Sequence, residues 1–104
     1  MKPNENPANL RLFMAVTSGD FELLISALNE GADVNYRAYR DFTVMMYAAS
    51  RGYNDHVLRL LESGADCRIK AYGRTAADYA KMHGHLDTYN LILSWGKDLL
   101  WSPK

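Results

Sequence analysis

Apolar residues fall at helical spacing in six stretches of this chain, separated by short polar segments. In the first stretch, Leu10, Phe13 and Met14 lie three and four positions apart, on one face of a helix. Asn6 and Pro7 precede it and are typical of an N-cap followed by the first helical residue. We therefore predict a helix over Pro7–Ser18. The same pattern predicts five more helices, over residues 20–30, 43–51, 54–63, 75–83 and 86–95.

Two sets of glycines punctuate these helices with one period. Gly31 is followed 33 positions later by Gly64 and, after 32 more, by Gly96. A second set, Gly19, Gly52 and Gly84, keeps the same spacing. Such a period indicates stacked repeats, each a helix pair that buries its apolar face against its neighbours. We predict a single domain over residues 1–104, with units at about 7–35, 36–68 and 69–98.

Two segments rich in tyrosine and arginine join the predicted helix pairs. We call residues 34–42 the first finger and residues 67–74 the second finger. Neither has helical periodicity, and both are expected to form projecting turns or hairpins. The second finger is one residue shorter, so the two need not share a conformation.

These units resemble ankyrin repeats, which combine a turn with two antiparallel helices in about 33 residues. The family's G-A-D-V-N is present at residues 31–35, and G-A-D returns at residues 64–66. The histidine of the family's T-P-L-H is replaced by Phe13, Met46 and Asp78, so the hydrogen-bond ladder that it supports is expected to be missing. The resemblance covers about residues 8–98. It implies an all-α ankyrin-repeat solenoid of three antiparallel helix pairs, in a small stand-alone array.

The resemblance also implies a binding surface, because ankyrin fingers and the exposed ends of the first helices commonly bind protein partners. By position, that surface comprises Arg37, Tyr39, Arg40, Phe42, Ser50, Arg51, Lys70, Tyr72, Arg74, Met82 and His83.

The net charge of the chain favours no class of partner, but the charge of the fingers does. The chain has 12 basic and 12 acidic residues, and its net charge is zero. From Tyr36 to Arg74, however, the finger residues hold five bases and one acid, Asp41. Tyrosine and arginine are also enriched at binding hot spots. We therefore expect a protein partner that is acidic at the contact, and no small-molecule substrate.

Other functions were weighed against this one. An immunity or inhibitor protein that blocks an enzyme is a sharper version of the same hypothesis. A basic, tyrosine-rich strip also suits nucleic acid, but the zero net charge argues against it. His83, His85 and Asp87 form an H-x-H-x-D run that could ligate a metal, but His85 falls at the family's G-H turn. No catalytic motif appears, so we expect no enzyme, no metal and no cofactor.

Compartment and the C-terminal segment complete the expectations. Cys67 is the single cysteine, which favours a core thiol in a reducing compartment. The N-terminal residues lack the apolar run of a secretory signal, and no stretch is long enough to cross a membrane. We therefore expect a cytoplasmic protein.

Residues 95–104 include Trp95 and Trp101. They either fold back as a cap on the last helix pair or form an exposed patch for a partner or a second copy.

Overall fold

The structure is a computed structural model that describes the backbone of residues 6–101 and the side chains of residues 6–95. This part of the chain forms six α-helices and one short 3-10 helix, and no β-strand longer than an isolated bridge. The helices are α1 (Pro7–Ser18), α2 (Phe21–Asn29), α3 (Val44–Arg51), α4 (Asn54–Glu62), α5 (Ala76–Met82) and α6 (Leu86–Trp101), with η2 (Tyr39–Asp41) in the first finger. The predicted all-α fold of three helix pairs is confirmed.

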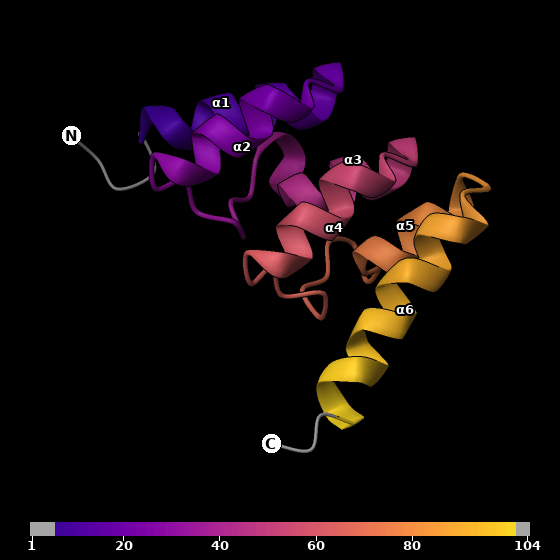
Figure 1. The fold of residues 1–104 in the computed structure, drawn as a ribbon. Coiled ribbons are helices and arrows are strands. Elements are labelled where there is room, and N and C mark those ends of the chain that lie inside the picture. Colours follow the sequence, from indigo (N-terminus) through magenta and orange to yellow (C-terminus); the bar gives the residue numbers. More distant parts are fainter. Residues whose placement is uncertain (1–5, 102–104) are drawn as a thin grey trace.

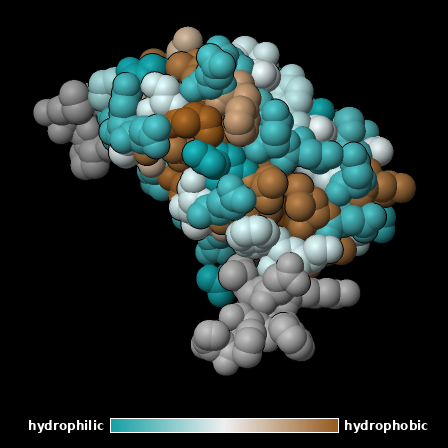
Figure 2. Space-filling model, viewed as in Figure 1, coloured by the Kyte–Doolittle hydropathy of each residue, from teal (hydrophilic) through white to brown (hydrophobic). Residues whose placement is uncertain are grey.

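The pairs stack side by side in chain order (Figure 1). The first helices, α1, α3 and α5, pack against one another as one layer, and α2, α4 and α6 form a second layer. One apolar core runs through all three pairs, and its largest fully buried members include Leu12, Leu24, Met46 and Leu60. On the face shown in Figure 2, the described apolar side chains form small groups separated by polar ones.

The starts of α1 and α3 are fixed by side chains that cap the first turn of each helix. The Ala8 amide donates a 2.9 Å hydrogen bond to Asn6 Oδ1, and the Met46 amide donates one of 3.2 Å to Thr43 Oγ1. Each bond satisfies an amide that has no partner inside its helix. The N-cap predicted at Asn6 is therefore confirmed, and Thr43 caps α3 in the same way.

Two aromatic rings pack on glycines of the preceding repeat. The ring of Tyr53 lies against Gly19, and that of His85 lies against Gly52. A Cβ on Gly52 would lie 2.6 Å from His85 Nδ1, and its φ of +72° also favours glycine. The period of the glycines therefore reflects contacts between repeats as well as helix termination.

Asparagine side chains hold the backbone at two equivalent aspartates. The Asp33 amide donates to Asn9 Oδ1 at 2.7 Å, and the equivalent Asp66 amide donates to Asn35 Oδ1 at 2.8 Å. The first bond lies within the unit 7–35, and the second joins that unit to the next, so asparagine side chains hold the amides of two equivalent aspartates.

Asp78, which replaces one of the family's histidines, also has a structural role. Its carboxylate accepts from the Thr75 amide at 3.0 Å, and the Thr75 hydroxyl accepts from the Asp78 amide at 3.3 Å. This capping box fixes the start of α5.

The predicted end of the last helix is wrong. We expected it at Trp95, but α6 continues to Trp101 and passes through Gly96 without a break. In Figure 1, its C-terminal half extends beyond the other helices. A glycine inside a helix costs only about 1 kcal/mol relative to alanine, which the surrounding helix formers can offset. The chain therefore does not turn back at Gly96. The side-chain contacts of residues 96–101, and residues 102–104, lie outside the described residues, so the choice between cap and patch stays open.

No helix in the described part of the chain is long and apolar enough to cross a membrane.

Candidate functional site

The two fingers differ in conformation. The first is closed by a bridge between Arg37 and Thr43 and carries η2 at its tip, whereas the second is a tighter turn closed by Ala71 and Arg74. Their shared feature is a left-handed backbone at the tips, with φ of +61° at Arg40 and +55° at Tyr72. Non-glycine residues rarely adopt this conformation.

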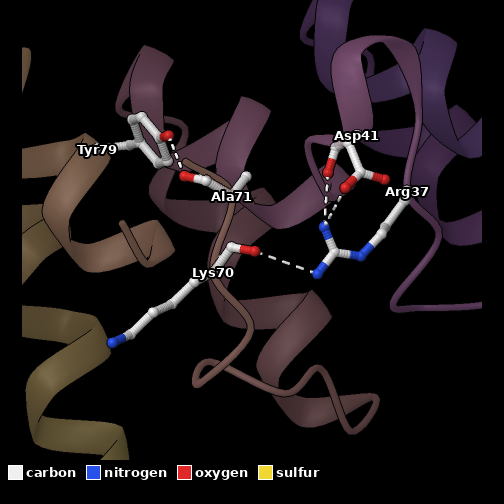
Figure 3. A network of polar contacts seen from close by, with 5 residues as sticks. All are labelled: Arg37, Asp41, Lys70, Ala71 and Tyr79. Carbon is white, nitrogen blue, oxygen red and sulfur yellow. Dashed lines mark hydrogen bonds and ion pairs between the residues drawn. The ribbon is translucent and has the colours of Figure 1, made fainter. Parts of the chain in front are cut away.

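Arg37 connects the two fingers (Figure 3). One guanidinium nitrogen donates to the backbone carbonyl of Asp41 at 2.8 Å and to its carboxylate at 3.1 Å. The other donates to the carbonyl of Lys70 at 3.2 Å. Arg37 was predicted to contact a partner, but the structure engages its guanidinium within the protein. The ammonium group of Lys70 points away from Arg37.

A pair of tyrosines ties the first helices to the fingers. The Tyr47 hydroxyl donates to the carbonyl of Tyr39 at 2.9 Å, and the Tyr79 hydroxyl donates to that of Ala71 at 2.5 Å. Both donors and both acceptors are 32 positions apart, so this is one contact repeated. Burial raises the pKa of the Tyr47 hydroxyl above its usual value. Sequence reasoning missed this pair, although the spacing of the tyrosines was visible.

Phe42 lies at the centre of an aromatic cluster. Its ring centroid is 5.8 Å from that of Tyr47, 5.5 Å from that of Tyr72 and 5.4 Å from that of Tyr79. Tyr47 in turn packs edge-on against Phe13 at 5.1 Å. The cluster therefore joins all three repeats, and aromatic pairs of this geometry stabilise beyond their buried area.

A cavity of about 270 Å³, which we call the aromatic cleft, opens beside this cluster. It lies between α3, α5 and the end of the first finger. Arg51 and His83, which occupy equivalent positions of successive repeats, both line it. The guanidinium carbon of Arg51 lies 5.7 Å from the centre of the Tyr47 ring. The full lining is Phe42, Met46, Tyr47, Ser50, Arg51, Tyr79 and His83.

The predicted surface residues fall into three groups. Phe42, Arg51 and His83 line the cleft, as does Ser50. Others are strongly exposed on the fingers and on α5: Tyr39, Arg40, Lys70, Tyr72, Arg74 and Met82. Arg37 alone is engaged by both fingers.

Charge on this surface is more compensated than the sequence suggested, because two of the five basic residues of the fingers form ion pairs. Arg37 pairs with Asp41 at 3.1 Å, and Arg68 pairs with Asp66 at 3.1 Å. Within residues 6–95, the remaining bases of the surface form no ion pair: Arg40, Arg51, Lys70 and Arg74. Their positive charge is available to a ligand.

His85 and Asp87, from the run that could have ligated a metal, make other contacts. His85 packs on Gly52, and Asp87 accepts a 2.9 Å hydrogen bond from Asn54, which lowers its pKa. His56 is buried, with Nδ1 3.0 Å from the Asp55 carboxylate. Within the described side chains, no three histidine, cysteine or acidic groups lie together as metal ligands would.

A second cavity, of about 350 Å³, lies between the C-terminal ends of α2 and α4. The charges at its wall, Arg59 and Glu62, approach to 3.9 Å of each other. It contains none of the predicted surface residues. Its lining is Leu28, Asn29, Ala32, Val34, Arg59, Glu62 and Ser63.

Stacked helix pairs joined by projecting fingers define a helical repeat protein. Residues 12–100 match the ankyrin repeat family in three copies. The chain belongs to the ankyrin repeat family. Ankyrin repeats are protein–protein interaction modules and are typically not catalytic.

Curated relatives share this region at moderate identity. The chain is 35% identical over 98 residues to E3 ubiquitin-protein ligase XBAT33 of Arabidopsis thaliana, covering 92% of this chain and 18% of the ligase. It is 32% identical over 97 residues to human BCL-6 corepressor-like protein 1, covering 91% of this chain and 5% of that protein. It is 37% identical over 65 residues to tyrosine-protein kinase HTK16 of Hydra vulgaris, covering 62% and 9%. The chain thus spans less than a fifth of the length of each.

Proposed function

We infer that this protein binds an acidic surface of a protein partner through its finger tips and aromatic cleft. The observation that carries this proposal is the uncompensated charge of Arg40, Arg51 and Arg74 beside exposed aromatic rings. We call the contact area the finger surface. It comprises Tyr39, Arg40, Tyr72, Arg74, Met82 and the rim of the cleft.

Electrostatics favours an acidic partner over a neutral one. Asp41, the one acid on the first finger, is paired with Arg37. A segregated positive patch steers an acidic partner into register and accelerates association, even though the total charge is zero. Nucleic acid would need a larger basic footprint than this chain offers.

The surface is also pre-organised for contact. Tyr39, Tyr72 and Met82 are 65%, 69% and 56% exposed, so each has apolar area to bury in a complex. The ring of Tyr72 rests on Phe42, and Arg37 ties the two fingers together. Side chains that are already ordered lose less entropy on binding.

The cellular setting follows from the same proposal. The single cysteine, Cys67, is half-buried against the core. A thiol with no possible internal disulfide partner suits the reducing cytoplasm, where we place the interaction. Catalysis and cofactors have no part in it.

Hydrogen–deuterium exchange on the complex tests the proposal. A partner is first captured from cells that produce the protein, and exchange is compared with and without it. We expect new protection in peptides that span residues 36–43 and 70–75, and unchanged exchange in α4. Protection confined to α2 and α4 would reject the finger surface.

A further inference from the structure

We propose that the aromatic cleft is an anchor site for one large apolar side chain of the partner, flanked by a carboxylate that pairs with Arg51. This rests on the proposed function, because the cleft opens within the finger surface, and it specifies the chemistry that the partner must present.

The floor of the cleft is apolar although two of its residues are tyrosines. The hydroxyl of Tyr47 is bound to the carbonyl of Tyr39, and that of Tyr79 to the carbonyl of Ala71. Both rings therefore offer carbon surface to the cleft, together with Phe42 and Met46. An occupant that buries apolar area there gains free energy without leaving these hydroxyls unpaired.

Volume decides the size of the occupant. Pockets for drug-sized molecules hold about 300–1,000 Å³, and the aromatic cleft holds about 270 Å³. It therefore has room for a single large side chain, such as leucine, methionine or phenylalanine.

The basic rim of the cleft indicates that the partner has an acidic residue next to the apolar side chain. Arg51 is exposed at the cleft and forms no ion pair with any residue whose side chain is described. Its guanidinium carbon lies 5.7 Å from the centre of the Tyr47 ring, and a guanidinium can bind a carboxylate through two parallel hydrogen bonds. Ser50 and His83 add hydrogen-bonding groups at the same rim. An acidic residue next to the apolar side chain in the partner's sequence provides the carboxylate for Arg51.

The test uses the full chain and a set of short labelled peptides in a glycine and serine background. Each peptide has one variable position, leucine, phenylalanine or alanine, between two glutamates, and a matched set has lysines in place of the glutamates. Binding is followed by fluorescence anisotropy and, for weak peptides, by NMR titration. We expect the leucine and phenylalanine peptides to bind at least about tenfold more tightly than the alanine peptide. We expect the lysine set to show no binding.

Variants of the chain separate the two parts of the site. Arg51→Gln should weaken every glutamate peptide about tenfold, because a charge-assisted hydrogen bond is lost. Arg59→Gln is the matched control, since Arg59 is the last-turn arginine of α4 as Arg51 is of α3. Ser50→Trp should fill the cleft and abolish the preference for leucine over alanine. Because that comparison is made on one folded protein with two peptides, it does not depend on the stability of the variant.

Several outcomes would overturn the proposal. These are no binding by any peptide at millimolar concentration, equal affinity for leucine and alanine peptides, or equal effects of Arg51→Gln and Arg59→Gln. If the cleft fails these tests while the captured partner still depends on Arg40 and Arg74, the finger surface stands without the anchor. If the peptides behave as expected but the partner ignores those two arginines, the finger surface is rejected and the cleft stands.

Discussion

Replacing Gly52 by alanine should destabilise the protein far more than the same change at Gly84. Both glycines follow a first helix and have positive φ, +72° and +81°. They differ in their surroundings, because a Cβ on Gly52 meets three atoms of the His85 ring at 2.6–2.9 Å, whereas one on Gly84 meets nothing within 4 Å. The pair therefore isolates a contact between repeats from backbone strain.

The magnitudes follow from these two terms. An alanine held in a left-handed conformation costs about 1 kcal/mol, and this applies at both positions. Overpacking against a ring costs about 1–3 kcal/mol more, and applies at Gly52 alone. Because 1 kcal/mol moves the midpoint of a domain of this size by about 4–8 °C, Gly52→Ala should melt roughly 4–24 °C below Gly84→Ala.

Thermal unfolding followed by circular dichroism at 222 nm measures the difference. Adding His85→Ala to Gly52→Ala provides a double-mutant cycle, in which removal of the ring should recover the overpacking part of the loss. Equal midpoints for Gly52→Ala and Gly84→Ala would refute the reasoning. So would a cycle with no coupling between the glycine and the ring.

Three further predictions concern hydrogen bonds. Tyr79→Phe removes the bond to the second finger and should lower the free energy of unfolding by about 1–2 kcal/mol in urea titrations; an unchanged midpoint would contradict it. Arg37→Gln should cost less, about 0.5–1 kcal/mol, because its contacts are exposed, and it should speed amide exchange in both fingers; unchanged exchange would count against the connection between them. The amide of Asn54 holds the pKa of Asp87 below its usual 3.8, and the guanidinium of Arg68 does the same for Asp66. The unfolded chain then takes up protons first as pH falls, so stability present at neutral pH should be lost below about pH 4, and Asp87→Asn should flatten that dependence in urea titrations between pH 7 and pH 3.

Much of the fold could be predicted because its determinants are local. The N-caps at Asn6 and Thr43 depend on residues two or three positions away, and the glycines that end helices depend on one backbone angle. The repeat period of about 33 residues then predicts which helices are equivalent and in which order the pairs stack, although no distance between them is known. The end of α6 was missed because Gly96 has the right phase, but phase alone does not stop a helix.

The site was predicted less completely, because its geometry depends on contacts between repeats. Arginine is a residue type that often binds partners, so Arg37 was predicted to do so. Its guanidinium instead donates a hydrogen bond to the backbone carbonyl of Lys70, 33 positions away. Tyr47 and Tyr79 resemble ordinary helix residues until the carbonyls of the fingers are placed beside them. Composition predicted that the fingers bind a partner, which stays a prediction, and only the structure showed which of their charges form ion pairs.

The affinity of the captured partner for two matched double variants tests the central claim most directly. Arg40→Gln with Arg74→Gln removes two uncompensated charges from the fingers. Arg11→Gln with Arg59→Gln removes two charges from ion pairs with Glu30 and Glu62. Both variants have the same net charge, so long-range electrostatics is matched. We predict that the finger variant binds at least about tenfold more weakly than the control in calorimetric titrations. Equal affinity of the two variants, with helical content unchanged, would contradict the account.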